Sequence, residues 1–372
     1  MKKIGIIGGG QLGRMMAMES KNLDIFISVL DPTLDCPAAF YADEHILGSF
    51  SDKETVLAFG EGKDVITFEI ESANAEALFE LEEQGIKIHP SPKTLAIIKD
   101  KFLQKEFLTS HGIPVAPYAV IESKDDVEVF AEVHGYPLVL KARRGAYDGR
   151  GNRTLTQRED TEIAITELGQ ELYIEAWVPF KKELAVVAAR GEDGTIRTYP
   201  VVETIHVDHI CDTIIAPAPV SDSVRERAEV LARKILEIFQ GAGVFGIEMF
   251  LTKEDKVLIN EIAPRVHNSG HFTLGGSSVS QFEQHMRAVC GEPLKEPVMK
   301  KTFAVMKNIL GTRNATADPQ GVAEAEALGA LVSIYGKKDT KEKRKMGHLT
   351  VVADSYEEAL RLATETRGLI DI

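Results

Sequence analysis

Short apolar runs alternate with amphipathic stretches of helical length over roughly the first 90 residues of the chain. The apolar runs predict strands at Lys3 to Ile7, Ile25 to Leu30, Val65 to Phe68 and Ile86 to Ile88. Because strands that alternate with helices normally pair in parallel, this region is predicted to form a Rossmann-like sheet with helices packed on it. Ser91 and Pro92 then favour a helix from Lys93 to Ser110, with a break near Asp100.

The middle of the chain changes to a pattern of short strands and turns. From Val115 to Leu184 only one helix is predicted, near Asp160 to Leu168. Ser223 to Gln240 is strongly amphipathic and predicts a long helix. Its expected start is a capping box of Ser223 with Glu226, and Gly241 is its expected end.

The composition shifts again beyond Gly291 to a small α/β pattern. Strands are predicted near Lys301 to Ile309, Leu331 to Tyr335 and His348 to Val352, and the last helix is expected to be capped by Ser355 with Glu358. These patterns predict an α/β and α+β multidomain protein: an N-terminal domain of residues 1–92, a central domain of residues 93–293 with a mobile subdomain at about 115–180, and a C-terminal α/β domain of residues 294–372.

Charge and cysteine content narrow the class of protein. The chain has 372 residues, is 44% hydrophobic and carries a net charge of −14, which argues against nucleic acid or an anionic membrane as a partner. Cys36, Cys211 and Cys290 are too far apart for a metal or redox motif, and such a sparse set suits reduced thiols in the cytoplasm. No apolar run approaches the ~18 residues of a membrane span.

A glycine-rich segment follows the first predicted strand. Gly8 to Gly13 precedes a helical pattern, and Asp31 ends the next strand, which formally matches a dinucleotide-binding fingerprint. An NAD-dependent dehydrogenase is therefore one interpretation. The less specific interpretation is an anion site at a helix N-terminus that any phosphate could occupy.

A second glycine-rich segment, Gly145 to Asn152, follows the apolar run Leu138 to Ala142, which contains Lys141. A lysine on a strand beside a loop with open backbone amides suits nucleotide phosphates, although a plain hairpin turn is the alternative. The chain has no Gly-x-x-x-x-Gly-Lys-Ser/Thr sequence, which excludes a P-loop.

Two strand-like runs, Val244 to Leu251 and Lys256 to Ile262, predict a hairpin with its turn at Thr252 to Asp255. If it folds symmetrically, Glu248 lies opposite Glu261 with the two Cβ atoms about 5 Å apart. Like charges so placed repel, so the pair predicts a bound cation, and Mg²⁺ prefers such oxygen ligands. The alternative is an exposed hairpin with coincidental acids.

Two further segments carry candidate chemistry. Tyr173 to Val178 ends near Glu183, so that a strand edge could hold an adenine while the carboxylate binds a ribose. Lys337 to Lys345 carries six positive and two negative residues, which indicates either a solvated surface loop or a phosphate-binding segment.

Together these features resemble the ATP-grasp superfamily over nearly the whole chain, beginning with Asp100-Lys101, Lys105, Leu108 and Gly112 to Pro114. Tyr147 to Arg150 and Ala263 to His271 are similar to signatures of the 5-(carboxyamino)imidazole ribonucleotide synthase family. The resemblance implies an ATP-grasp architecture with a Rossmann-like N-terminal domain and a small C-terminal domain. It also implies ATP- and bicarbonate-dependent carboxylation of 5-aminoimidazole ribonucleotide through carboxyphosphate, with Mg²⁺, by a cytoplasmic homodimer.

The resemblance also assigns roles to residues. The ATP-binding set is Lys101, Lys141, Ala146, Tyr147, Asp148, Gly149, Arg150, Gly151, Asn152, Glu175, Ala176, Trp177, Val178, Glu183, His206, Asn260 and Glu261. The substrate-binding set is Gly10, Gln11, Leu12, Glu69, Arg150, Asn268, Lys337 and Arg344. Glu248 and Glu261 would bind Mg²⁺, and the catalytic set is Arg265, His267, Asp148 and Tyr147, with His267 or Asp148 as the base.

Two positions depart from the family pattern. Ala146 stands where a second glycine is usual, and Ala263 stands where relatives often have a metal-binding asparagine that Asn268 would replace. Other ATP-grasp ligases, such as glycinamide ribonucleotide synthetase or biotin carboxylase, are the alternatives within the superfamily. The run from His267 to His271 speaks against both.

Overall fold

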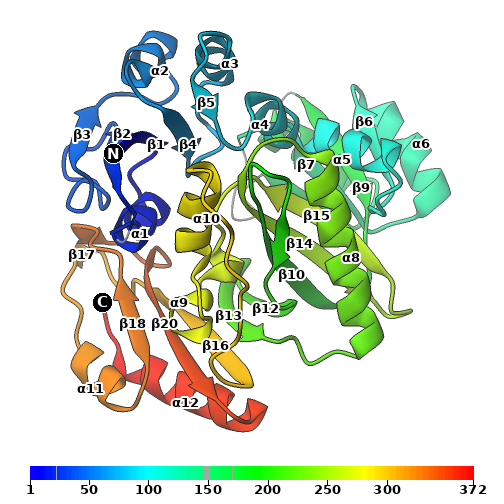
Figure 1. Cartoon of the computed structure of the whole chain (residues 1–372). Coiled ribbons are helices and arrows are strands. Elements are labelled where there is room, and N and C mark those ends of the chain that lie inside the picture. The colour runs from blue at the N-terminus through cyan, green and yellow to red at the C-terminus, as the bar shows by residue number, and fades with distance from the viewer. Residues whose placement is uncertain (22, 146–150, 170) are drawn as a thin grey trace.

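The computed structural model describes residues 1–21, 23–145, 151–169 and 171–372. Its N-terminal part is a parallel five-stranded sheet of order β3-β2-β1-β4-β5 (Figure 1), which confirms the predicted arrangement. Its elements are β1 (Lys2–Ile7), α1 (Gln11–Glu19), β2 (Ile25–Asp31), β3 (Glu44–Leu47), α2 (Lys53–Gly60), β4 (Val65–Phe68), α3 (Ala75–Glu83) and β5 (Lys87–Ile88). Because β1 and β4 are parallel neighbours, the glycine segment after β1 and Glu69 after β4 meet at one sheet edge.

Two helices connect this sheet to the rest of the chain, α4 (Pro92–Lys99) and α5 (Lys101–Ser110). The predicted break at Asp100 is confirmed. The Asp100 carboxylate accepts hydrogen bonds from the backbone N–H groups of Phe102 and Leu103, at 3.1 and 3.2 Å, and thereby caps α5.

A small antiparallel sheet of order β6-β9-β7-β8 follows. Its elements are β6 (Tyr118–Ile121), α6 (Lys124–His134), β7 (Leu138–Ala142), β8 (Asn152–Leu155), α7 (Asp160–Leu168) and β9 (Leu172–Ala176). The structure confirms α7, but the expectation of a single helix in this region was wrong. α6 begins with a capping box of Ser123 and Asp126 and buries Val127 and Phe130, a signal that a short helix provides only weakly.

The largest sheet has nine strands and contains the order β15-β14-β10-β12-β13-β16-β20-β18. The elements of this part are β10 (Phe180–Arg190), β11 (Ile196–Thr198), β12 (Val202–Val207), β13 (Ile210–Ala216), α8 (Asp222–Ile238), β14 (Gly243–Thr252), β15 (Val257–Ala263), η1 (Asn268–Gly270), α9 (Thr273–Gly276), α10 (Gln281–Val289), β16 (Phe303–Leu310), β17 (Ala315–Thr316), α11 (Val322–Ala327), β18 (Leu331–Ile334), β19 (Asp339–Thr340), β20 (Lys345–Ala353) and α12 (Tyr356–Leu369). The predicted C-terminal strands are present, and β16 pairs with β13 so that they continue this sheet.

Helix ends test the capping predictions. The predicted capping box at the start of α8 was wrong, because the N-cap residue is Ser221 rather than Ser223, and the helix ends at Ile238 before Gly241. At the start of α12 the predicted N-cap is confirmed, since the Ser355 hydroxyl accepts a hydrogen bond from the Glu358 backbone N–H at 3.3 Å.

One hydrophobic core connects all three parts of the chain. It joins Ile4 and Met16 of the N-terminal part to Phe282 of α10 and to Met306 and Tyr335 of the C-terminal part. α10 lies between the N-terminal part and the nine-stranded sheet (Figure 1), so it contacts elements on both sides. Among the described residues, no helix has the length and apolar character needed to cross a membrane.

Candidate active site

Two carboxylates face each other on the hairpin of β14 and β15. Glu248 pairs with Glu261 in the antiparallel register, as predicted. The register shifts directly afterwards, so that Met249 pairs with Ile259 and Asn260 is the extra residue of a β-bulge. The Asn260 side chain turns toward the pair, with its Nδ2 atom 3.4 Å from the Glu248 carboxylate.

The electrostatics of this pair favour a bound cation. Burial, followed by the neighbouring charge of Glu261, raises the pKa of Glu248 to about 7. Both side chains keep partial exposure, 35% for Glu248 and 43% for Glu261, so a ligand can reach them. Within the described residues no group of three or more His, Cys, Asp or Glu side chains is arranged for a metal. A cation here would take its other ligands from phosphate and water, which is the usual way in which proteins hold Mg²⁺.

Lys101 forms an ion pair with one member of this pair. Its Nζ atom lies 2.7 Å from Glu261. Burial alone would raise the pKa of Glu261, but Lys101, together with Lys141 and Lys105, holds that pKa below its ordinary value. The start of α5 fixes the lysine, because Asp100 caps the helix and the Lys101 backbone N–H donates to the Arg143 carbonyl at 2.9 Å.

Lys141 belongs to a second, deeper ion cluster. The buried Glu175 carboxylate lies 2.7 Å from Lys141 and 3.0 Å from Lys105. Burial opposes its ionisation, but the two ammonium groups lower the pKa of Glu175 to about 2. Burial lowers the pKa of Lys105 although Glu175 opposes this shift, and the neighbouring Lys141 ammonium lowers it further. The Glu175 side chain therefore positions lysines, and only its backbone is available for an adenine.

The neighbouring strand edge holds the other predicted nucleotide residues. Trp177 follows β9 and is 45% exposed. On β10, Glu183 lies 2.5 Å from Nδ1 of His206 on β12. Burial opposes protonation of His206, but Glu183 raises the pKa of His206 above the ordinary value. Glu183 on β10 therefore favours a proton on His206 of β12.

Arg265 and His267 follow β15 and lie between the carboxylate pair and the N-terminal sheet. The Arg265 guanidinium is 2.7 Å from Glu71, which follows β4. The Nδ1 atom of the His267 ring lies 2.8 Å from the Ser269 hydroxyl and 3.3 Å from the Ser269 backbone nitrogen, and its Nε2 atom lies 3.5 Å from Glu248. Burial, followed by the neighbouring charge of Arg265, lowers the pKa of His267 to about 3, so the ring is neutral.

The glycine-rich segment before α1 has two carboxylates of its own as partners. Glu69 accepts hydrogen bonds from the N–H groups of Gly10, at 2.5 Å, and Gly13, at 2.9 Å. Burial raises the pKa of Glu69 to about 7 in spite of these bonds. Asp31 accepts from the Gly9 N–H at 2.8 Å and so contributes to the structure of the loop. The N–H groups of Gly9, Gly10 and Gly13 already have carboxylate partners and are not open to a dinucleotide pyrophosphate, which argues against the NAD-binding interpretation.

The C-terminal basic segment reaches the same helix end. Lys337 donates to the Gln11 side chain at 2.8 Å and to the Lys345 carbonyl at 2.6 Å. Arg344 precedes Lys345 and donates to the Asp339 carbonyl at 2.7 Å. Leu12 packs against the shared core. Lys337 and Gln11, predicted substrate residues from the two ends of the chain, therefore lie together.

The remaining predicted residues are placed as follows. Both polar atoms of the Asn268 amide are buried without a nitrogen or oxygen partner among the described residues. Gly151 is buried, and Asn152 begins β8. Ala176 ends β9, and Val178 accepts from Phe180 through its carbonyl at 2.8 Å. Five predicted residues lie outside the described ones: Ala146, Tyr147, Asp148, Gly149 and Arg150.

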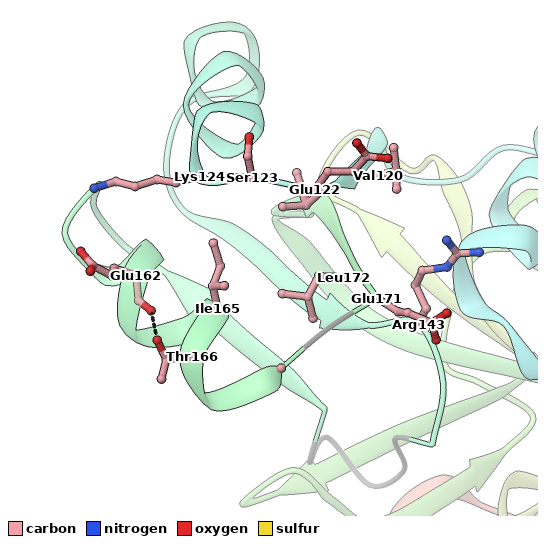
Figure 2. A pocket seen from close by; sticks show the side chains of 12 residues that line it. Val120, Glu122, Ser123, Lys124, Arg143, Glu162, Ile165, Thr166, Glu171 and Leu172 are labelled. Atoms are coloured by element: carbon pink, nitrogen blue, oxygen red, sulfur yellow. Dashed lines mark hydrogen bonds between the residues drawn. The ribbon is translucent and has the colours of Figure 1, made fainter.

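A separate pocket of about 780 Å³ lies among β6, α6, α7 and β9, and Figure 2 shows its lining. Its walls include Glu122, Lys124, Ile165 and Leu172, and none of the paired carboxylates of the nucleotide region. Arg143 connects it with the Asp100 cap. The pocket is therefore distinct from the candidate site.

Family models match three consecutive segments of the chain. They are the ribonucleotide synthetase preATP-grasp domain at residues 1–99, the ATP-grasp domain at residues 106–282 and the phosphoribosylaminoimidazole carboxylase C-terminal domain at residues 304–362. The N5-carboxyaminoimidazole ribonucleotide synthase of Bacillus subtilis is 37% identical over 364 residues, covering 97% of this chain and 94% of that protein. The chain belongs to the N5-carboxyaminoimidazole ribonucleotide synthase family, within the ATP-grasp ligases.

Other relatives of this family agree in sequence and structure. The phosphoribosylaminoimidazole carboxylase of Ogataea methanolica is 42% identical over 96% of this chain, which spans 68% of that protein's length. The synthetase structure from Thermotoga maritima has a TM-score of 0.91 and 44% identity, covering 100% of this chain and 99% of that one. The Aspergillus clavatus synthase in complex with ADP and 5-aminoimidazole ribonucleotide has a TM-score of 0.91 and 37% identity, covering 99% and 98%.

The structure adds residues to which the sequence assigned no role. Lys105 lies 70 residues from its partner Glu175, and Glu71 lies far along the chain from Arg265. Lys105 was part of the superfamily resemblance but had no role there, and Glu71 gave no signal beyond its charge, which most surface residues share. Gln281 contacts the backbone of His267, and no motif indicated it.

Proposed function

We propose that this protein carboxylates 5-aminoimidazole ribonucleotide with ATP and bicarbonate, releasing ADP and phosphate. The observation that carries the proposal is the position of Arg265. Its guanidinium bonds to Glu71 and interacts with the charges of Glu69 and Glu261. It thus lies between the proposed ribonucleotide end and the proposed nucleotide end of the site.

At the nucleotide end, Lys101 and Lys141 supply positive charge for the phosphates. The strand edge of Glu175 to Val178 borders the adenine, and Glu183 with His206 faces the ribose. Glu248 and Glu261 fit Mg²⁺, because two opposed carboxylates without a lysine for each leave uncompensated negative charge. Bound there, the ion would neutralise charge on the phosphates.

At the other end, Glu69 and the Gly10 to Leu12 segment, with Lys337 and Arg344, hold the ribonucleotide. The contacts of Gln11 with Lys337 and of Gly10 with Glu69 support this proposal. A ribose hydroxyl can donate to Glu69, while the ammonium and guanidinium groups suit a ribose phosphate.

The chemistry proceeds in three bond changes. A bicarbonate oxygen attacks the γ-phosphorus, and the bond to ADP breaks, giving carboxyphosphate. The bond between the carboxyl carbon and the bridging oxygen of carboxyphosphate then breaks, which yields CO₂ and phosphate. The exocyclic amine then bonds to the CO₂ carbon and loses a proton. Arg265 stabilises the charge that develops on the transferring phosphoryl group and on the carboxylate.

The proton leaves the amine to a base that the sequence narrowed to His267 or Asp148. The neutral His267 ring lies beside Glu248 and can accept a proton. His267 is also proposed to hold bicarbonate or carboxyphosphate, and both His267 and Asp148 stay candidates for the base. Asp148 lies outside the described residues.

The state of the protein in the cell is part of the proposal. Free, buried thiols at Cys36, Cys211 and Cys290 suit the reducing cytoplasm. A homodimer is proposed from the family resemblance alone. Sedimentation at micromolar concentration tests it, and a monomer mass would contradict it.

The test of the function is ADP release with bicarbonate and 5-aminoimidazole ribonucleotide supplied separately and together. The full rate is expected only with both, and with ADP rather than AMP as the product. AMP formation, or a rate indifferent to the ribonucleotide, would overturn the proposal.

A further inference from the structure

Gln281, the first residue of α10, contacts the backbone of His267 at two atoms. Its Oε1 atom accepts a hydrogen bond from the His267 N–H at 2.9 Å. Its Nε2 atom donates to the His267 carbonyl at 2.7 Å. The Gln281 side chain is fully buried, so neither bond is exposed to competition from bulk water.

These two bonds fix which way the Gln281 amide points, because a backbone N–H requires an acceptor and a carbonyl requires a donor. The Nε2 atom also lies 3.1 Å from Nδ1 of His271 and donates to it. One amide therefore holds both histidines of the segment from Arg265 to His271.

The neighbouring glycines show how closely this arrangement is packed. A Cβ atom on Gly270 would lie 2.4 Å from Oε1 of Gln281. A Cβ atom on Gly246 would lie 2.4 Å from Cβ of His267. The His267 residue is thus confined between β14 and the Gln281 amide, with its ring directed at Glu248.

We propose that Gln281 is a positioning residue for the carboxylation reaction: its amide fixes the His267 backbone and so sets the position of the imidazole beside Glu248. The inference rests on the proposed function. Gln281 does not touch the proposed substrates and acts on the reaction through His267.

The chain contains a matched control in the same helix. Gln284 is also fully buried, and its amide also holds both backbone atoms of one residue, donating to the Lys295 carbonyl at 2.6 Å and accepting from the Lys295 N–H at 3.1 Å. Lys295 is not among the predicted site residues. Replacing either glutamine removes the same kind of contact, but only one contact holds the active-site histidine.

The experiment compares Gln281→Met with Gln284→Met in the full chain, with ADP release and ribonucleotide carboxylation measured at saturating substrates. Gln281→Met is expected to lower kcat roughly 10- to 100-fold, the effect of a displacement of about 1 Å, with the KM for ATP within about twofold of wild type. Gln284→Met is expected to keep the wild-type kcat while losing a similar amount of thermal stability. Equal kcat values for the two variants would overturn the inference.

A second measurement separates positioning from a general structural effect. Because Gln281 acts through His267, Gln281→Met should lower kcat no further in the His267→Ala background. An undiminished additional loss would contradict the inference. If either methionine variant fails to fold, Gln281→Glu and Gln284→Glu replace the pair, since an ionised carboxylate accepts from the N–H but cannot donate to the carbonyl. The same order of activities is expected, and equal activities would again overturn the inference.

Failure of the proposed function is distinguishable from failure of this inference. If the function is wrong, the wild-type protein itself releases no ADP in response to the ribonucleotide. If only the inference is wrong, the wild type is active and the two variants do not differ.

Discussion

Glu248 lies opposite Glu261 on the neighbouring strand, and Lys101 bonds to Glu261 at 2.7 Å. Like charges that face each other across a ladder destabilise a sheet unless something compensates them. Burial is the main cause of the raised pKa of Glu248, about 7, and the charge of Glu261 adds to it, so the ionised carboxylate is unfavourable without a cation.

Glu248→Gln should therefore stabilise the metal-free protein while impairing catalysis. Above pH 7 the variant removes an unfavourable charge, and we expect its Tm to rise by roughly 1–3 °C, since partial exposure screens the repulsion. Magnesium-dependent ADP release should fall by at least ~100-fold. Calorimetry in EDTA and in excess Mg²⁺ measures both effects, and a lower Tm in EDTA would contradict the repulsion.

NAD should not bind to the N-terminal sheet. Gly10 and Gly13 donate to Glu69 and Gly9 donates to Asp31, so the amides that a pyrophosphate would need already have partners. Isothermal titration with NAD to about 1 mM should give no binding heat, whereas ADP with Mg²⁺ should bind. Saturable NAD binding would restore the dehydrogenase interpretation.

Arg265→Ala should abolish carboxylation and leave nucleotide binding largely intact. The guanidinium lies beside Glu71 and interacts with Glu69 and Glu261, whereas Lys101 and Lys141 would still bind the phosphates. We expect kcat to fall by ~100-fold or more, with the Kd of ADP changed by less than about threefold. Full carboxylation by the variant would exclude the proposed role, and Glu254→Ala in the β14–β15 turn is a surface control.

Lys337→Ala should weaken binding of the ribonucleotide and leave binding of ATP unchanged. Lys337 donates a hydrogen bond to Gln11 at the start of α1. Gln11 is far along the chain from the residues proposed to bind ATP. Loss of one charge-assisted contact predicts a roughly 10-fold rise in the KM for the ribonucleotide. Lys338→Ala, one residue along, is the control, and an equal change in both variants would argue for a diffuse charge effect.

Because of Glu175, the free energy of unfolding should decrease as the pH becomes acidic. Lys105 and Lys141 hold its pKa near 2 instead of 4.5, so its contribution is present above pH 4.5 and is lost as the pH falls toward 2. The shift corresponds to on the order of 3 kcal/mol. Urea unfolding between pH 5 and pH 3 should show a shallower pH dependence for Glu175→Gln than for wild type. An identical dependence would mean that the buried carboxylate is not the titrating group.

The sequence predicted the features that depend on local periodicity. The apolar runs located four of the five N-terminal strands, and the symmetry of one hairpin placed Glu248 opposite Glu261. β3 was missed because its four residues include Glu44 and His45 and show no continuous apolar run. α6 was missed because two buried side chains give a weak helical signal.

Features that depend on distant pairing could not be predicted. The glycine segment by itself indicated an anion site, and only the family resemblance grouped Glu69, 59 residues from Gly10, with that segment; the hydrogen bond from the Gly10 N–H to Glu69 was not predicted. The same holds for Gln281, an uncharged residue whose function arises only when α10 packs beside η1. Such contacts follow from tertiary packing, which a single sequence does not specify by spacing.

The continuous nine-stranded sheet also determines where this chain can be cut. A fragment ending near residue 293 would lose β16 and leave β13 as an open edge, with those backbone groups of Thr213 to Ala216 that face β16 unpaired. Exposed edges of this kind recruit strands from other molecules, so the fragment would aggregate when expressed alone. The C-terminal segment therefore covers the edge of the catalytic sheet. The catalytic and C-terminal segments must be expressed and engineered together.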